Sequence, residues 1–100
     1  GNENIRFYQF GEYKLDSRRR ILFKNSDRVD ISAKNFELLF FLIQNEGRIL
    51  SHDEILDAVW RGTFVEQSNL KKGISALRQI LEERPNESLF IKTVPRQGYA

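Results

Sequence analysis

The sequence contains no cysteine and only one histidine, His52. Without cysteine the chain can form neither a disulfide framework nor a cysteine-based zinc site, and a chain of this kind suits a reducing compartment. One histidine cannot hold a metal ion by itself. We therefore expect a fold that is held together by burial of apolar side chains, with no metal and no cofactor.

Long apolar runs are also missing. No stretch approaches the roughly 18–20 apolar residues that cross a bilayer, and the N-terminus has no signal-peptide pattern. The sequence therefore predicts a cytoplasmic domain, and a membrane anchor of the full-length protein would have to lie outside it. One hundred residues, 40% of them hydrophobic, suffice for one modest core, so we expect a single domain over residues 1–100.

The net charge of +2 is small, but it is unevenly distributed. Residues 1–60 hold nine Lys and Arg against ten Asp and Glu, whereas residues 61–100 hold seven against four. Within residues 67–81 the only charged residues are Lys71, Lys72 and Arg78. A positive C-terminal part suits a polyanionic partner such as nucleic acid, although an ordinary solvated basic face has the same composition.

Short aromatic and β-branched runs separated by turn-forming residues occupy the first third of the chain and predict an antiparallel meander. The predicted strands are Phe7–Phe10, Tyr13–Leu15, Ile21–Phe23 and Arg28–Ile31. Arg18, Arg19 and Arg20 occupy one of the connections. A basic run at such a place is typical of a solvated turn and is less often a contact for nucleic acid or a partner.

From residue 32 onwards the apolar residues recur at helical spacing. Ser32 is predicted to cap a helix over Ala33–Asn45 that ends at Gly47. The segment from Ser51 to Glu54 has the pattern of a capping box, which predicts a short helix that continues to about Trp60.

A third helix is predicted over about residues 66–82, because Leu70, Ile74, Leu77 and Leu81 form one apolar stripe. Pro85 prevents the helix from continuing much further. A strand over Leu89–Val94, a tight turn over Pro95–Gly98 and the start of a returning strand at Tyr99 complete the predicted order.

The sequence offers little for catalysis. It has no glycine-rich phosphate loop, nucleophile elbow or metal-ligand spacing. His52 beside Asp53 and Glu54 resembles an acid–base cluster, but a histidine in the first turn of a capped helix is typically solvated. We therefore expect a domain that is not an enzyme and has no small-molecule substrate, and a hydrolase or transferase is the least favoured alternative.

The third predicted helix has the surface of a reading helix. With its apolar stripe turned inward, one flank carries Asn69, Lys72, Ala76 and Gln79, and the other carries Lys71, Ser75 and Arg78. The major groove of DNA, about 12 Å wide, admits one helix and presents acceptors and donors that Asn and Lys can read. An amphipathic surface helix would show the same pattern, but a preceding short helix and a following hairpin together form a docking frame for DNA.

Five segments resemble, in matching order and spacing, the winged helix of OmpR/PhoB-type transcriptional regulators. They are Ile31–Leu39, Gly47–Ser51, Glu54–Trp60, Ile74–Leu81 and Ile91–Tyr99, and the resemblance covers about residues 7–100. Residues 62–66 and the sequence Val94-Pro95-Arg96 are most similar to the ToxR/CadC-like subtype. The resemblance implies an α+β winged helix-turn-helix fold with an N-terminal four-stranded antiparallel sheet, three helices and a C-terminal β-hairpin wing. It also implies a bacterial protein that binds specific duplex DNA.

The resemblance assigns roles to individual residues, with the third helix in the major groove and the wing at the adjacent minor groove. Base-reading positions fall on Asn69, Lys72, Gly73 and Ala76. The DNA backbone is expected to meet Trp60, Ser68, Lys71, Ser75, Arg78, Thr93 and Tyr99, and the minor groove is expected to meet Arg96. The loop of Arg61, Gly62, Thr63, Phe64 and Val65 matches one that can contact RNA polymerase in relatives.

The sequence departs from this family pattern in four places, one of which is the wing, where Arg96 is displaced by one and follows Pro95. Ala76 stands where some relatives carry a base-reading Arg, and Ser75 stands where some carry a second basic residue. A single copy is therefore expected to bind weakly, with a second copy on an adjacent half-site adding avidity. The chain also stops at Ala100, where relatives continue the wing strand, so we expect it to be a fragment of a longer regulator.

Two interpretations stay open on sequence alone. Trp60 closes the short helix either as a core residue or with its indole N–H turned to a phosphate, and the two roles are compatible. The same winged-helix frame could instead bind a protein partner, with the basic face incidental. Binding to duplex DNA that falls steeply with salt would favour the DNA interpretation.

Overall fold

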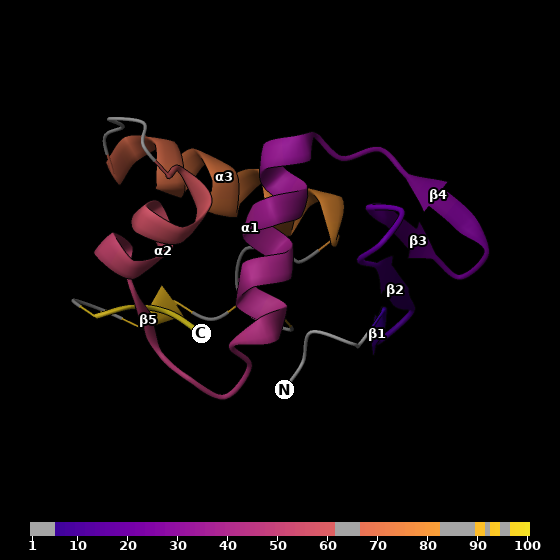
Figure 1. The fold of residues 1–100 in the computed structure, drawn as a ribbon, viewed down its shortest axis with the longest axis horizontal. Helices are drawn as coiled ribbons and strands as arrows, with labels where there is room; N and C mark the ends of the chain where they lie inside the picture. The colour runs from indigo at the N-terminus through magenta and orange to yellow at the C-terminus, as the bar shows by residue number, and fades with distance from the viewer. Residues whose placement is uncertain (1–5, 62–66, 83–89, 92, 95–96) are drawn as a thin grey trace.

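The computed structural model describes residues 6–61, 67–82, 90, 91, 93, 94 and 97–100. Four strands come first, then three helices, then a hairpin (Figure 1). The first strands are β1 (Phe7–Phe10), β2 (Tyr13–Asp16), β3 (Ile21–Lys24) and β4 (Asp27–Val29). The helices are α1 (Ala33–Gln44), α2 (His52–Val59) and α3 (Gln67–Ile80), and the remaining strands are β5 (Leu50–Ser51), β6 (Thr93–Val94) and β7 (Gly98–Tyr99).

The N-terminal sheet is the predicted antiparallel meander, with strand order β1-β2-β3-β4. Its strands lie within two residues of their predicted bounds. The register pairs Tyr8 with Leu15 and Leu15 with Leu22, so these side chains share one face of the sheet. Leu15 and Leu22 are fully buried, and the Tyr8 ring meets the Phe40 ring of α1 at 5.7 Å between centroids. The apolar face of the sheet therefore packs on α1.

A buried carboxylate organises the β2–β3 turn. Asp16 accepts two hydrogen bonds of 3.1 Å from the Arg6 guanidinium, and the backbone N–H groups of Arg18 and Arg19 both donate to its Oδ1. The Arg6 hydrogen bond, followed by these backbone donors, lowers the pKa of Asp16 to about 2, against the opposing effect of its burial. The run of Arg18, Arg19 and Arg20 thus lies on a turn that the buried Asp16 carboxylate stabilises. The sequence pattern did not predict this role of Asp16.

The predicted helix caps are confirmed. The Ser32 hydroxyl accepts from the backbone N–H of Asn35 at the start of α1. At the start of α2 the Ser51 hydroxyl accepts from the backbone N–H of Glu54, whose carboxylate in turn accepts from the Ser51 N–H. Each cap satisfies backbone donors that the first turn of a helix leaves without partners.

The C-terminal hairpin pairs with a strand that was not predicted. β5 hydrogen-bonds to β7, which also pairs with β6, giving the order β5-β7-β6. Gly98 permits this pairing, because a Cβ at its position would lie 1.8 Å from the Leu50 carbonyl oxygen. A two-residue strand such as β5 is too short to leave a periodic pattern in the sequence.

The predicted strand over Leu89–Val94 is wrong in its extent, because β6 contains only Thr93–Val94. Phe90 and Ile91 lie outside any strand, and Leu89 and Lys92 lie outside the described residues. The Phe90 ring packs edge-on against Phe10 and Tyr13 of the first sheet, and Ile91 is buried. These two side chains therefore pack in the core and do not take part in the hairpin.

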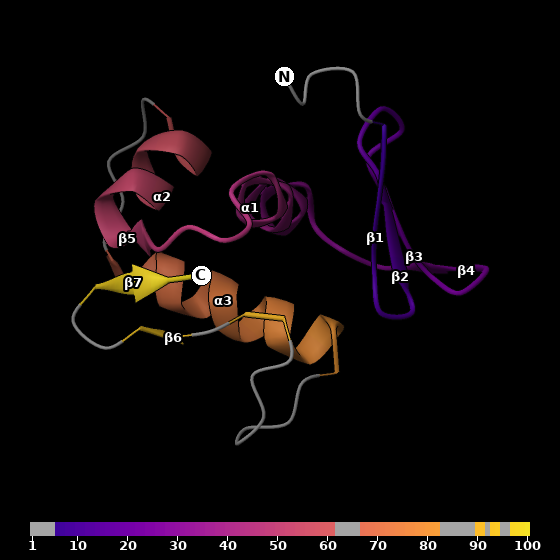
Figure 2. The ribbon, with the colours of Figure 1, turned by 90° about the horizontal axis from the view of Figure 1, so that it is seen from below.

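Helix α1 is the centre of the molecule. Figure 2 shows it end-on, with the first sheet on one side, α2 on the opposite side and α3 running below it. Its Phe36, Leu38 and Leu39 are buried in one core with residues of every other layer. The arrangement is the predicted α+β winged helix. No helix among the described residues is long and apolar enough to cross a bilayer.

Candidate nucleic-acid interface

Helix α3 presents a sharply two-sided surface. Leu70, Ile74, Leu77 and Leu81 are at most 2% exposed and form the predicted inner stripe. Its opposite side exposes Ser68, Asn69, Lys71, Lys72, Ser75 and Gln79. No acidic residue lies in the first turn, and Arg78 lies in the last. The helix therefore offers amide, hydroxyl and ammonium donors, with no carboxylate among them to repel a polyanion.

Asn69 and Lys72 lie on the exposed side of α3, as a reading role requires, and Ala76 is half-buried. Lys71 and Lys72 form no ion pair within the part of the chain that the structure describes. Their ammonium groups are therefore solvated, and no ion pair would have to break when they contact a phosphate or a base edge.

Gly73 does not belong to this exposed group, and its predicted base-reading role is wrong. It is buried on the inner side of α3, where a Cβ would lie 2.9 Å from Cδ2 of Leu38 and 3.7 Å from the Trp60 ring. Its small size lets α3 approach α1 closely and leaves it no access to a base. The sequence pattern could not separate these two uses of a small residue.

Trp60 is the C-cap of α2 and packs, half-buried, against the core. Its ring covers the Gly73 position and has the Lys34 ammonium 5.8 Å from its centroid. The core interpretation of Trp60 is therefore confirmed, and its predicted contact with the DNA backbone stays a prediction.

Arg78 links α3 to the hairpin. Its Nη2 donates to Thr93 Oγ1 at 2.7 Å and to the Ile91 carbonyl oxygen at 3.2 Å. Both Arg78 and Thr93 are predicted contacts of the DNA backbone, and nothing in the sequence indicates that they bind each other. This contact becomes visible only in the folded chain, where Arg78 of α3 lies next to Thr93 of β6.

Tyr99 and His52 form another contact of the hairpin with the helices. Tyr99 is 6% exposed, and its ring centroid lies 5.5 Å from that of His52. His52 thus packs on an aromatic ring, while Glu54 binds Arg48 at 2.8 Å. The described residues contain no cluster of His, Asp or Glu that could hold a metal ion.

Some predicted site residues cannot be placed. Arg96 of the wing and Gly62, Thr63, Phe64 and Val65 of the loop after α2 lie outside the described residues. Arg61, the first residue of that loop, is exposed and donates from its Nε to the Ala58 carbonyl oxygen at 3.2 Å.

Residues 26–100 match the family model described as "Transcriptional regulatory protein, C terminal". Among curated proteins, the transcriptional activator CadC of Escherichia coli is 31% identical over 90 residues, which is 89% of this chain and 18% of CadC. RegX3, a sensory transduction protein of Mycolicibacterium smegmatis, is 30% identical over 90 residues, or 40% of its length. The chain thus spans well under half of these relatives.

Solved structures give the same grouping. The response regulator DrrB of Thermotoga maritima, described as an OmpR/PhoB homologue, superposes with a TM-score of 0.88 at 30% identity, over 98% of this chain and 45% of DrrB. The DNA-binding domain of Klebsiella pneumoniae RstA, solved in complex with the RstA box, superposes with a TM-score of 0.84 at 28% identity, over 95% of both chains.

Proposed function

Because the chain belongs to the transcriptional regulatory protein C-terminal family, we propose that it binds duplex DNA at specific sequences and regulates transcription. The observation that carries this proposal is the exposed side of α3, which has several hydrogen-bond donors, two solvated lysines and no acidic residue. The RstA domain, solved with its DNA box, superposes over nearly the whole chain and supports the same use of the fold.

In this proposal α3 enters the major groove. Asn69 and Lys72 read base edges, since an amide can bond adenine in two places and an ammonium can bond the acceptors of guanine. Ala76, which is small and half-buried, offers apolar contact to a thymine methyl group or simply permits close approach. With so few reading residues, a substantial share of the affinity comes from the backbone contacts.

The backbone contacts frame the reading helix. Phosphates bind Ser68, Lys71 and Ser75 on α3, and the hairpin adds Thr93 and Tyr99, with Arg78 placed between the two elements. Trp60 contributes its indole N–H from the end of α2, and Arg96 reaches the minor groove. Phosphate contacts of this kind fix position and orientation, and base contacts supply the specificity.

Two further partners belong to this proposal. A second copy on an adjacent half-site would add avidity to a weak single-domain contact. The loop that begins at Arg61 and continues through residues 62–65 would contact RNA polymerase. Both would act outside the contact between α3 and the bases.

Selection from random duplexes, followed by titration, tests the proposed function. We expect an enriched sequence that binds much more tightly than its scrambled version, with log K falling linearly with log salt. Equal binding to both duplexes would contradict sequence reading. Failure to bind DNA at low salt would leave the protein-partner interpretation of the fold in its place.

A further inference from the structure

A groove of about 490 Å³ opens between α1, α2 and the β2–β3 turn. Its apolar floor includes Phe40 and Phe41 of α1 and Val59 of α2. Its lining residues belong to these elements and to Arg61 just after α2, so an occupant would leave the exposed side of α3 uncovered. The groove is therefore separate from the proposed DNA interface.

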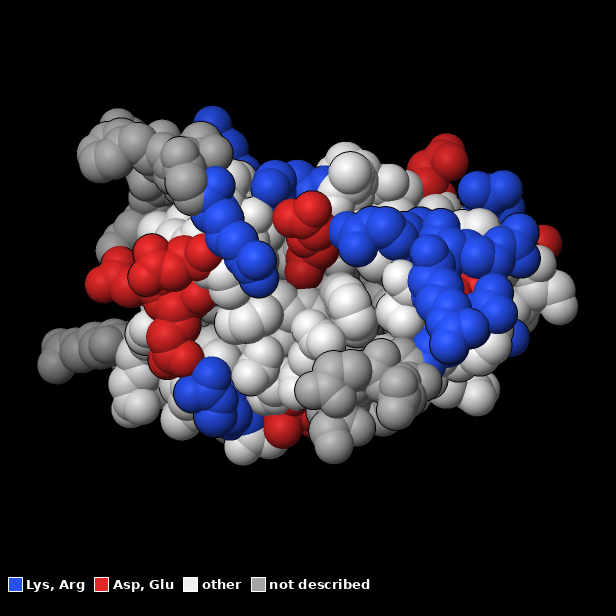
Figure 3. Space-filling model, in the orientation of Figure 1, with Lys and Arg blue, Asp and Glu red and all other residues white. Residues whose placement is uncertain are grey.

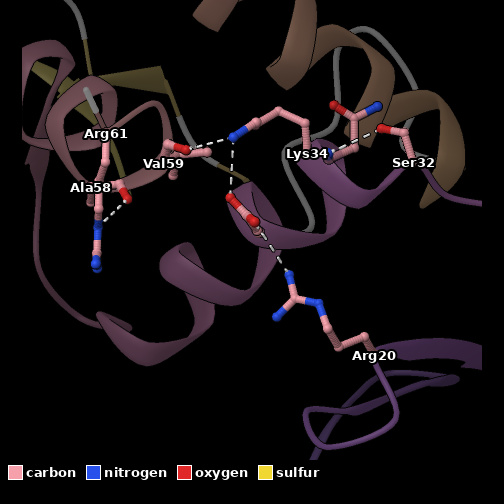
Figure 4. A network of polar contacts seen from close by, with 8 residues as sticks. Arg20, Ser32, Lys34, Ala58, Val59 and Arg61 are labelled. Carbon is pink, nitrogen blue, oxygen red and sulfur yellow. Dashed lines mark hydrogen bonds and ion pairs between the residues drawn. The ribbon is translucent and has the colours of Figure 1, made fainter. Parts of the chain in front are cut away.

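The polar lining of the groove consists of Gln44, three cations and one carboxylate, and Figure 4 labels the three cations. Glu37 accepts from Lys34 Nζ at 3.3 Å and lies 3.6 Å from Arg20 Nη2. Lys34 Nζ also donates to the Val59 carbonyl oxygen at 2.8 Å, which ties α1 to the end of α2. Arg61 also lines the groove and donates to the Ala58 carbonyl oxygen, while Arg20, Lys34 and Glu37 together carry a net charge of +1.

Arg20, on one side of Glu37, keeps unused hydrogen-bonding capacity. The side chains of Arg20 and Glu37 are 45% and 44% exposed, and their 3.6 Å separation is too long for a good hydrogen bond. The Arg20 guanidinium also lies over the Phe36 ring at 4.8 Å, which fixes its position at the edge of the groove. Arg20 can therefore bind an incoming carboxylate while its stem stays in place.

The surrounding surface limits where an anion could bind. Figure 3 shows acidic side chains gathered over α2, at the end of the molecule opposite the basic side chains of the first sheet. The outer side of α2 exposes Asp53, Glu54 and Asp57. An acidic partner is repelled there and attracted to the groove, where apolar surface and cations occur together.

We propose that this groove binds an acidic, partly apolar segment of another protein. Apolar side chains of that segment would cover Phe40, Phe41 and Val59, and its carboxylates would bind Arg20. This interaction needs no contact with DNA, so its failure would leave the proposed binding of DNA by α3 unaffected.

The test uses a short fluorescent peptide in which aspartates and glutamates flank a Leu-Phe pair, measured by anisotropy against the whole chain. We expect saturable binding that weakens about tenfold in Arg20→Glu, which removes an attraction and adds a repulsion. Arg19→Glu is the matched control, because Arg19 is exposed on the same turn and does not line the groove. It should change binding by less than about twofold, as expected for a surface charge away from the contact.

Ala58→Glu is a second variant that keeps the rim cations and places a carboxylate in the groove lining. It should also weaken peptide binding while thermal melting shows a folded protein and binding to duplex DNA is retained. Equal losses in Arg19→Glu and Arg20→Glu would overturn the proposal, because they indicate diffuse attraction. Equal binding of a peptide with Asn and Gln in place of Asp and Glu, or no binding by any peptide, would overturn it as well.

Discussion

Arg78 of α3 and Thr93 of β6 are joined by a hydrogen bond of 2.7 Å from the guanidinium to the hydroxyl. The same nitrogen donates to the Ile91 carbonyl oxygen, just before the hairpin. The orientation of the hairpin relative to α3 is therefore set in part by a cation that lies between the two elements proposed to contact DNA. A single side chain can serve both the fold and the proposed contact with phosphate.

Arg78→Ala removes the link and the cation together. We expect a loss of about 1–2 kcal/mol in the free energy of unfolding, because a charge-assisted bond is lost at a partly exposed site. Affinity for all duplexes should fall about equally, with a salt slope lower by about one unit. Thr93→Val is the control: it removes the acceptor but keeps the cation, so it should lower stability and leave the slope unchanged. Identical salt slopes for parent and Arg78→Ala would contradict a phosphate contact.

Gly73→Ala should destabilise the protein, although alanine favours helix by about 1 kcal/mol over glycine. The new Cβ would lie 2.9 Å from Cδ2 of Leu38, whose side chain is fully buried and has little room to move. Overpacking of this kind costs about 1–3 kcal/mol, which outweighs the gain in propensity. Urea melts would show the loss, and Ser75→Ala at an exposed position of α3 should show none. A more stable Gly73→Ala would mean that α1 and α3 can separate freely.

Ser51→Ala should lower stability by about 0.5–2 kcal/mol, because the backbone N–H of Glu54 loses its acceptor. The cap also lies in β5, next to the pairing with Gly98, so the hairpin should loosen as well. Thermal melts of the free protein measure the first effect, and hydrogen exchange at Tyr99 measures the second. An unchanged melting temperature together with weaker DNA binding would instead make Ser51 a phosphate contact.

The repeating parts of the fold were predictable, and the connections between them were not. Period and capping residues located the first four strands and α1 to α3, because these signals depend only on neighbours in the sequence. β5, the Arg78–Thr93 bond and the true place of Gly73 depend on residues that meet only after folding. The groove was missed for the same reason: Arg20, Lys34 and Arg61 come from three separate elements.

Asp16 makes the stability of the first sheet depend on acidity. Its folded pKa of about 2 lies below the ordinary value of 3.8, chiefly because of the Arg6 hydrogen bond. The stabilisation is therefore fully present above pH 3.8 and is lost as the pH falls from there through about 2. Asp16→Asn should be less stable at neutral pH and should flatten this part of the pH profile in urea melts. An unchanged pH profile in Asp16→Asn would contradict the assignment to Asp16.

Lys72 and Lys71 are adjacent exposed lysines of α3 with different proposed tasks. The helix turns by about 100° between them. In the major groove of DNA, only one of them can therefore point at the base edges while the other points at the phosphate backbone. Lys72→Ala should cost about 1–3 kcal/mol on the selected duplex and much less on the scrambled one, because a base contact is lost. Lys71→Ala should weaken both duplexes about equally and lower the salt slope by about one unit, because a phosphate contact is lost. Both changes remove one positive charge from the same helix. A difference between the two variants therefore separates base recognition from general electrostatic attraction to the phosphates. If both variants weakened both duplexes equally, Lys72 would be a second phosphate contact, and the reading of bases would rest on Asn69 and the wing.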